Sequence, residues 1–454
     1  MNMMHTSYFL DFLERYSRRL LWGVIGGAFL VSLFYSFYYR IEPMVDAEAY
    51  NVIAQNIISG NGYRMDTNDI PLNADRSMIK SGPGYEFLLV GFFYVFGHRY
   101  EPVWIFQALF HALSALLVFL ISRRLFKDMW HPAMGLTGAA LIAFSPDLIL
   151  ASSMLLVENF ALFLMLLFVW WFFRYDDMPS ASGAGLAGVL FGAVYLTRSP
   201  LGILLLPASA LFWVRKRFVH AIVFLFCCAI LMAPWAVRNY RVFHKFVPTN
   251  LAVGDAFLNG NNPNATGEID DSRYEYTTPL RFAERFSANK TEIDMALGFI
   301  KADPLRFLKI TFYRVSIYFS IARPTGWWPY LEGMRFQQLA VVVSSAVYAF
   351  VLFLLGGAGV LGAITRTTGQ TRQRVLFFTV MLILMPVSFM FLIVETRYRY
   401  SAYPFMALFA GYAFTLLMRE RNFFDRALLI SFSLFSLNTL FDVARNFQRI
   451  LDRL

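Results

Sequence analysis

Apolar stretches long enough to cross a lipid bilayer recur along the chain, and they limit its fold more than any other feature. Hydrophobic residues make up 58% and charged residues only 15% of its 454 residues, whereas an average soluble domain has about 25% charged residues. In a bilayer every backbone polar group needs an internal partner, so a spanning segment of about 20 apolar residues is a helix. We therefore predict an all-α polytopic membrane protein, with about eleven transmembrane helices and further helices at the membrane interface. The predicted spans are residues 20–39, 102–122, 134–150, 159–174, 183–197, 200–214, 219–236, 337–361, 375–394, 402–418 and 424–440.

Short basic clusters between the apolar stretches orient the chain. Arg15, Arg18 and Arg19 precede the first span, which places the N-terminus in the cytoplasm and makes that span an uncleaved anchor. This distribution accounts for the net charge of +10 without a nucleic-acid partner. Three further clusters are predicted to be cytoplasmic: Arg123, Arg124 and Lys127; Arg215, Lys216 and Arg217; and Arg366, Arg372 and Arg374.

The spans divide the chain into three predicted regions. Residues 1–236 form a transmembrane core with an outer loop at 40–100. Residues 237–335 form an extracytoplasmic insert, and residues 336–454 hold the C-terminal transmembrane helices. Because the mass outside the membrane is concentrated on one side, we expect the chemistry to take place there.

Helices at the membrane interface are expected in two of these regions. The apolar stretches 84–97 and 307–321 are assigned to the interface, since counting them as spans would put basic clusters on opposite sides. A further helix is predicted from Asp46 to Ser59, ending at Gly60. Asp46 is predicted to be its N-cap.

The sequence lacks the motifs of a disulfide framework, of a metal site and of a nucleotide-binding site. Cys227 and Cys228 are adjacent within an apolar stretch, so they form neither a long-range disulfide nor a multi-cysteine metal site. The six histidines have no metal-ligand spacing, and no glycine-rich nucleotide loop is present. A nucleotide-driven pump is therefore not expected.

Ionisable residues gather at the predicted outer ends of the helices. Any one of these charges, taken alone, also fits a membrane anchor or a satisfied salt bridge. As a group they match a different chemistry: Lys and Arg hold phosphate, and a carboxylate takes a proton from a hydroxyl. The cations would also stabilise a leaving phosphate, whereas a pair of carboxylates would suit a divalent cation. The residues are Asp46, Glu48, Lys80, Glu158, Arg198, Glu395, Arg397 and Arg399.

The segments around these residues also carry a likeness to a known family. The ordered series resembles the GT-C superfamily of polyprenyl-phosphate-sugar glycosyltransferases, in particular the bacterial branch related to protein O-mannosyltransferases and to the lipid A aminoarabinose transferase. The likeness extends over most of the chain. Its segments are 46–63, 81–85, 144–146 followed by Glu158, 196–200, 234–240 with 260–267, and 395–398 leading to Pro404.

The resemblance implies a reaction and assigns roles to residues. It implies an inverting transfer on the extracytoplasmic face of the inner membrane, from a sugar on undecaprenyl phosphate or a similar lipid to an acceptor hydroxyl. Asp46 is then the catalytic base, and Glu158 a second acid that assists or orients the acceptor. The phosphate ligands are Lys80, Arg198, Arg397 and Arg399, and the further substrate-binding residues are Glu48, Tyr50, Tyr85, Arg238, Glu395 and Tyr398.

The resemblance implies some of the binding partners and leaves the acceptor open. A polyprenyl-phosphate sugar donor and membrane lipids are expected, with no nucleic acid. The acceptor stays open among lipopolysaccharide or another envelope glycan, a lipid and a protein. No cofactor is assigned, and a divalent cation such as Mg²⁺ or Mn²⁺ stays open.

The chain departs from the pattern of this family near its first acid. Many relatives pair Asp with Glu directly, whereas here Ala47 separates Asp46 from Glu48. Ala49 stands where aminoarabinose transferases have arginine. Lys80 is displaced by about a residue from the basic position of its relatives. These departures argue against assigning a narrow subfamily.

Other interpretations stay open from the sequence alone. Asp46 also fits a helix N-cap, Glu158 a buried partner of Arg198, and Tyr398 an aromatic anchor at the interface. A flippase or transporter of a lipid-linked sugar is the alternative function, although such proteins show paired repeats and interrupted helices near the midplane. We find no internal repeat. An inactive membrane scaffold is the third possibility.

Overall fold

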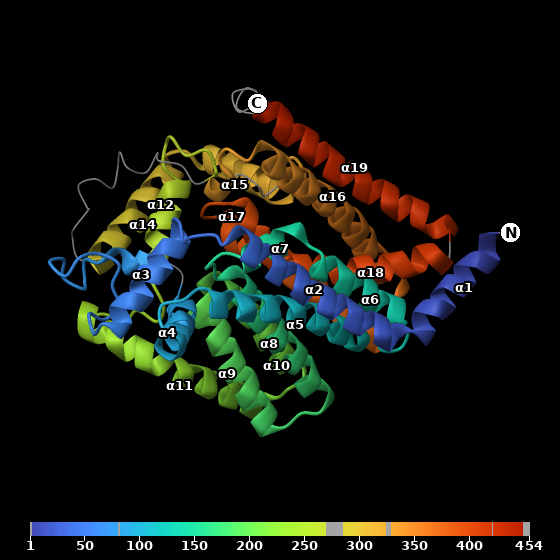
Figure 1. Cartoon of the computed structure of the whole chain (residues 1–454), viewed down its shortest axis with the longest axis horizontal. Coiled ribbons are helices and arrows are strands. Elements are labelled where there is room, and N and C mark those ends of the chain that lie inside the picture. The colour runs from blue at the N-terminus through green and yellow to red at the C-terminus, as the bar shows by residue number, and fades with distance from the viewer. Residues whose placement is uncertain (1, 80–81, 269–284, 324–327, 420, 448–454) are drawn as a thin grey trace.

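The computed structural model describes residues 2–79, 82–268, 285–323, 328–419 and 421–447. Every regular element in these ranges is a helix, which confirms the predicted all-α class. Figure 1 shows α3, α4, α12 and α14 gathered at one end of the molecule and α1 at the other. The α-helices are α1 Asn2–Arg15, α2 Ser17–Tyr39, α3 Asp46–Ile58, α4 Gly84–Phe96, α5 Glu101–Leu125, α6 Pro132–Ala143, α7 Pro146–Ser152, α8 Glu158–Asp177, α9 Ala181–Thr197, α10 Leu205–Val214, α11 Phe218–Phe243, α12 Ala252–Gly260, α14 Arg285–Ala302, α15 Pro304–Phe319, α16 Arg335–Arg366, α17 Gly369–Met390, α18 Tyr403–Arg419 and α19 Arg421–Arg445. Short 3₁₀ helices are η1 Arg76–Ile79, η2 Ser199–Leu204, η4 Pro329–Leu331 and η5 Thr396–Ser401.

Seven of the described helices are long and apolar enough to cross a membrane. They are α2, α5, α8, α11, α16, α17 and the part of α19 from Arg426 to Arg445. The bent pair α6 and α7 makes an eighth if it is one span, and α4, α9 and the η2–α10 segment are shorter apolar helices. The expected count of eleven spans is therefore not confirmed.

The predicted span 134–150 is broken rather than continuous. Helices α6 and α7 meet at a bend of 52°. Pro146 has no N–H for a continuing helix and disfavours helical geometry in the residue before it. Ser145 is extended, and its hydroxyl accepts a hydrogen bond from the Leu148 N–H at 3.4 Å, so a new helix starts here.

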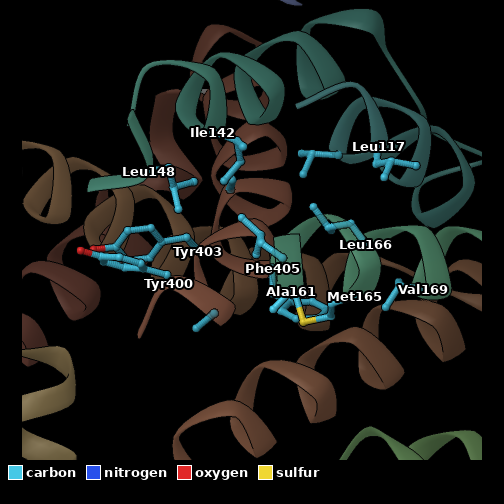
Figure 2. Packing of buried hydrophobic residues seen from close by; sticks show 14 of the residues in the cluster. Leu117, Ile142, Leu148, Ala161, Met165, Leu166, Val169, Tyr400, Tyr403 and Phe405 are labelled. Atoms are coloured by element: carbon cyan, nitrogen blue, oxygen red, sulfur yellow. The ribbon is translucent and has the colours of Figure 1, made fainter. Parts of the chain in front are cut away.

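Helix α18 is almost wholly buried and packs against both α6 and α16. Gly411 faces the carbonyl of Met134 on α6, and a Cβ there would lie 2.0 Å from that oxygen. Small residues of this kind let helix backbones approach closely, which is how membrane helices associate. Figure 2 shows the same core, in which Phe405 of α18 lies among Ile142 of α6 and Met165 of α8. This packing positions η5, which directly precedes α18.

The loop at 40–100, predicted to be an outer one, contains α3 and α4, both near their predicted bounds. Asp46 is the first residue of α3, and Val45, with a φ of 55°, occupies the cap position. The prediction that Asp46 is the N-cap is therefore wrong by one residue. Between the two helices the buried Asp75 carboxylate accepts backbone N–H hydrogen bonds from Met65, Asp66 and Ser77 at 2.8–3.2 Å, which organises the loop.

Two of the predicted region boundaries fall near or inside helices. Helix α11 continues to Phe243 and so crosses the expected boundary at residue 237, while α16 begins at Arg335. The stretch predicted as an interfacial helix at 307–321 is α15, which exposes Leu305, Leu308 and Phe312. This apolar side is consistent with the proposed place of α15 at a lipid interface.

Three of the basic segments converge at one end of the bundle on Asp176 and Asp177, the last two residues of α8. Arg217 Nη1 lies 2.9 Å from Asp176 Oδ1, and Arg215 Nε and Nη2 lie 3.2 Å from the two oxygens of the same carboxylate. Arg124 and Arg374 both contact Asp177. These four arginines and two aspartates, here called the arginine hub, confirm that the three segments lie on the same side.

Candidate active site

Five of the charged residues singled out from the sequence form one cluster at the other end of α8. Arg397 is its centre: Nη2 lies 2.6 Å from Asp46 Oδ2, Nη1 lies 3.8 Å from Glu158 Oε1, and Nε donates to Glu395 Oε2. Arg198 Nη1 donates to Glu158 Oε1 at 3.1 Å. Asp46, Glu158, Arg198, Glu395 and Arg397 are called the charge cluster below.

Each member of the charge cluster stands at the end of a helix or in a 3₁₀ turn. Asp46 and Glu158 are the first residues of α3 and α8, where the helix dipole favours a negative charge. Arg198 follows the last residue of α9, where the dipole favours a positive charge. Glu395 and Arg397 are brought in by η5. The cluster therefore assembles residues that are up to 351 positions apart in the chain.

The glycines of the 81–85 motif have a structural role beside Arg198. A Cβ on Gly82 would lie 1.9 Å from the carbonyl oxygen of Leu196, and one on Gly84 would lie 2.4 Å from the Thr197 hydroxyl. Only a residue without a side chain lets the loop lie against the end of α9 at this distance. The motif thus fixes the turn that presents Arg198.

Two cavities meet at the charge cluster, and both are lined by Val45, Asp46, Glu395 and Arg397. The first, called the Trp328 cavity, has a volume of about 350 Å³. The second, called the Arg198 cavity, has a volume of about 370 Å³. The Trp328 cavity is also lined by Ile41, Glu42, Met44, Ala47, Met154, Leu156, Trp328, Pro329, Tyr330 and Thr396. The Arg198 cavity is also lined by Tyr50, Val157, Glu158, Arg198, Ser199, Pro200, Asn250, Ala252, Val253, Asp255, Ala256, Phe389, Leu392, Ile393 and Tyr398.

Electrostatics hold Arg397 in its charged form. Burial by itself lowers the pKa of Arg397, but the carboxylates of Glu395, Glu158 and Asp46 outweigh it and raise the pKa well above its ordinary value. Within the cluster three acids face two arginines, so Arg397 is shared among carboxylates rather than paired with one. A shared cation of this kind is available to a further anion if one of its partners is released.

Tyr398 contacts Arg198 through the face of its ring. The guanidinium of Arg198 lies 5.5 Å from the centre of the Tyr398 ring, within the range of a cation–π contact. The ring itself stacks on Phe389 at 4.4 Å between centroids. Burial, followed by the neighbouring Glu395, raises the pKa of the Tyr398 hydroxyl above its ordinary range. Its phenol is therefore neutral and lines the Arg198 cavity.

Several residues predicted from the sequence lie elsewhere. Arg399 is fully buried and faces Asp147 and Tyr403, away from both cavities. Arg238 lies over the rings of Tyr63 and Trp235 and donates to the Tyr63 carbonyl at 3.1 Å, so it joins the first outer loop to α11. The contacts of these two arginines join parts of the protein to each other, and neither side chain lines the two cavities.

The remaining predicted residues divide between cavity and core. Tyr50 lines the Arg198 cavity and packs against the fully buried Tyr85, with ring centroids 5.5 Å apart. Glu48 is exposed and lines neither of the two cavities. Lys80 lies outside the described residues.

Sequence reasoning missed polar residues that line the Arg198 cavity. Ser199 and Asn250 are hydrogen-bonded to each other at 3.3 Å, and Asp255 lies near them on α12. Ser199 directly follows Arg198 in the 196–200 segment, so the sequence could have indicated it. Asn250 and Asp255 come from the predicted insert, between the 234–240 and 260–267 segments, where no motif marks them. Among the described residues no group of three or more His, Cys, Asp or Glu side chains is placed to hold a metal ion.

Comparison with known proteins finds similarity to glycosyltransferases, both in sequence and in fold. The family model described as dolichyl-phosphate-mannose-protein mannosyltransferase matches residues 80–237, a stretch that contains Glu158 and Arg198 but not Asp46 or Arg397. The oligosaccharyltransferase AglB from Archaeoglobus fulgidus, in complex with an inhibitory peptide and a dolichol-phosphate, superposes with a TM-score of 0.53 at 16% identity, over 95% of this chain and 56% of that one. The chain has the GT-C fold. The fold that the resemblance implied is thereby confirmed.

Two further solved structures resemble the chain over different shares of their own lengths. The same archaeal enzyme in complex with Zn and sulfate gives a TM-score of 0.52 at 15% identity, over 93% of this chain and 52% of that one. The chain thus spans about half the length of the oligosaccharyltransferase whose fold it resembles. ArnT from Cupriavidus metallidurans bound to undecaprenyl phosphate gives a TM-score of 0.40 at 14% identity, over 87% and 77% of the two chains. No curated protein sequence matches the chain significantly.

Proposed function

We propose that this GT-C protein is an integral membrane glycosyltransferase, which moves a sugar from a polyprenyl-phosphate carrier to an acceptor hydroxyl. The observation that carries the proposal is the place of Asp46: a carboxylate at the wall common to two cavities, held by Arg397 at 2.6 Å. Such a position lets one carboxylate face an acceptor from one cavity and a donor from the other. The archaeal relative in complex with dolichol-phosphate supports a lipid-phosphate donor.

The donor is assigned to the Arg198 cavity. This cavity brings Arg198 and Arg397 to one space, and two guanidinium groups suit the phosphate of a lipid carrier. Its polar lining of Tyr50, Ser199 and Asn250 offers hydroxyl and amide groups for a sugar. Lys80 remains a proposed phosphate ligand from its place in the sequence.

The acceptor is assigned to the Trp328 cavity. Its walls combine the aromatic side chains of Trp328 and Tyr330 with the acidic groups of Glu42 and Glu395. A hydroxyl that enters from this side reaches Asp46 without passing through the donor pocket. A lipid, a glycan and a protein side chain all carry such a hydroxyl.

The reaction then follows from the charges. A phosphate in the Arg198 cavity competes with Asp46 for Arg397 and frees this carboxylate to act as a base. Asp46 takes the proton of the acceptor hydroxyl, and the oxygen forms a bond to the anomeric carbon from the face opposite the phosphate. The bond from that carbon to the phosphate oxygen breaks, its electron pair leaves with the polyprenyl phosphate, and the arginines stabilise that charge. Attack from the opposite face inverts the anomeric configuration.

Two acids keep the arginines in place. Glu158 holds Arg198 at 3.1 Å and lies 3.8 Å from Arg397, so we assign it an orienting role rather than that of a second base. Glu395 contacts Arg397 through Nε. A divalent cation is not part of this proposal.

The active site is proposed to face the periplasm or cell exterior of the cytoplasmic membrane. Glu158 and Asp177 are the two ends of α8, whose 20 residues extend about 30 Å. The charge cluster and the arginine hub are thus separated by about the thickness of the hydrocarbon core. Because arginine-rich segments stay on the cytoplasmic side, the hub marks that side and the charge cluster the other.

The substitution Asp46→Asn tests the proposal. Loss of a general base lowers the rate by about 10²–10⁴-fold, so we expect cells with Asp46→Asn to lack one glycosyl unit and to accumulate a lipid-phosphate sugar, as measured by mass spectrometry of lipids and surface glycans. Glu101→Gln is the matched control, since Glu101 pairs with Arg40 on the surface at 2.8 Å, away from both cavities. A folded Asp46→Asn protein that still transfers sugar would defeat the base assignment. Movement of a lipid-linked sugar across liposomes without a glycoside would indicate the transporter instead.

A further inference from the structure

Arg399 and Asp147 belong to a buried polar network directly behind the charge cluster. Arg399, Tyr403 and Ser345 are 0% exposed and Asp147 is 1% exposed. Asp147 Oδ2 accepts from the Tyr403 hydroxyl at 2.5 Å, and Oδ1 accepts from the Ser345 hydroxyl at 2.6 Å. Arg399 donates through Nε to the Tyr403 oxygen at 2.8 Å and through Nη1 to the Ser320 carbonyl at 3.0 Å. The network thus joins η5 to α7, α16, α18 and the end of α15.

The tyrosine links the arginine to the aspartate. Arg399 Nη2 lies 3.9 Å from Asp147 Oδ2, which is too long for a hydrogen bond. The Tyr403 hydroxyl lies on the path between them, since it accepts from Arg399 and donates to Asp147. Removal of this one oxygen breaks the hydrogen-bonded link between two buried opposite charges, whose arrangement then has to change.

Arg399 stands two residues after Arg397 on η5. A 3₁₀ helix has three residues per turn, so side chains two positions apart point to different faces. Arg397 accordingly points to the charge cluster, and Arg399 points to the buried network. Any movement of η5 at Arg399 is therefore passed to Arg397, and a displacement of about 1 Å at a catalytic group is enough to lower a rate by about 10²-fold.

We infer that Tyr403 and Asp147 are positioning residues, which fix η5 through Arg399 and so hold Arg397 against Asp46. For its catalytic consequence this inference rests on the proposed function. The placement of Arg397 itself is independent of that function and is testable without a substrate.

The chain offers a matched pair of substitutions for the test. Tyr403→Phe removes the hydroxyl that bonds Asp147 Oδ2 and Arg399, whereas Ser345→Ala removes the hydroxyl that bonds Asp147 Oδ1 and lies on α16 rather than beside η5. Both changes delete one buried oxygen from the same carboxylate. Only the first breaks a contact with Arg399.

Two measurements on the full-length purified protein decide the matter. The first is the rate at which p-hydroxyphenylglyoxal modifies Arg397, followed by mass spectrometry; the second is kcat for sugar transfer. Tyr403→Phe is expected to raise the modification rate of Arg397 at least about threefold and to lower kcat about tenfold or more, with Ser345→Ala within about twofold of wild type in both. If Tyr403→Phe does not fold, Asp147→Asn, which keeps the side-chain volume, is expected to change both readouts in the same direction.

The outcomes separate the inference from the proposed function. Equal modification of Arg397 in all variants would overturn the inference, and so would equal effects of Tyr403→Phe and Ser345→Ala, because the network would then serve stability alone. If the wild-type protein transfers no sugar while Arg397 becomes more reactive in Tyr403→Phe, the positioning role stands and the proposed function fails.

Discussion

The two ends of α8 carry charged clusters of opposite design. At the arginine hub each of two aspartates is held by two arginines, so that the cations outnumber the acids. At the charge cluster three acids share two arginines, and the groups line two cavities. The Asp176 carboxylate already has two arginine partners, so a further cation would stabilise it little. Arg397, by contrast, shares its one positive charge among three carboxylates. The difference distinguishes ion pairs that join helices from ion pairs that are open to exchange with a ligand.

The largest expected contrast comes from replacing arginine by lysine at each end. Arg397→Lys keeps the charge but loses the fork that reaches Asp46, Glu158 and Glu395 together. Loss of one such stabilising group typically costs about 10²–10³-fold in rate, so we expect a fall of that size in kcat/KM with a small change in Tm.

Arg215→Lys is the counterpart at the hub. Arg217, which lies 2.9 Å from Asp176 in the wild-type structure, is left unchanged in this variant. We therefore expect kcat/KM to stay within about threefold of wild type. Kinetic assays and thermal unfolding in detergent measure both quantities. Near-normal transfer by Arg397→Lys would contradict the assignment of this side chain to the leaving phosphate.

Asp176→Asn is expected to produce the opposite pattern. The Asp176 side chain is only 3% exposed. It joins the end of α8 to Arg215 and Arg217, which directly follow α10. Breaking a buried ion pair costs about 3–5 kcal/mol of stability, and the partial exposure of Arg215 and Arg217 places this case at about 3 kcal/mol. Thermal unfolding should show a clearly lowered Tm, with kcat per folded molecule close to wild type. A specific loss of kcat at unchanged Tm would mean that the hub acts on the site.

Much of this arrangement was predictable from the pattern of the sequence. Apolar periodicity and helix signals located the helices, including α3 and α15, and the basic segments indicated one common side. Placing Asp46, Glu158, Arg198 and Arg397 at outer helix ends was enough to expect them in one region. The structure then brought them into direct contact.

The parts that sequence reasoning could not give depend on packing. Arg397 and Arg399 look equivalent in the motif, and only the three-residue turn of η5 sends one to the cavities and the other into the core. Arg238 was expected to bind substrate, but its guanidinium lies over the rings of Tyr63 and Trp235. The span at 134–150 was taken as continuous despite Pro146, whose missing N–H produces the bend.

The smallest expected effect concerns two glycines, of which only one approaches another backbone closely. Gly82→Ala puts a Cβ 1.9 Å from the Leu196 carbonyl oxygen, so the loop must move away from the turn that presents Arg198. We expect a loss of about 1–3 kcal/mol in stability and a raised KM for the lipid-phosphate donor. Gly91→Ala on α4 is the matched control, since a Cβ there meets nothing within 4 Å and alanine favours the helix. If both variants behave alike in Tm and KM, the close approach of Gly82 to α9 does not position Arg198.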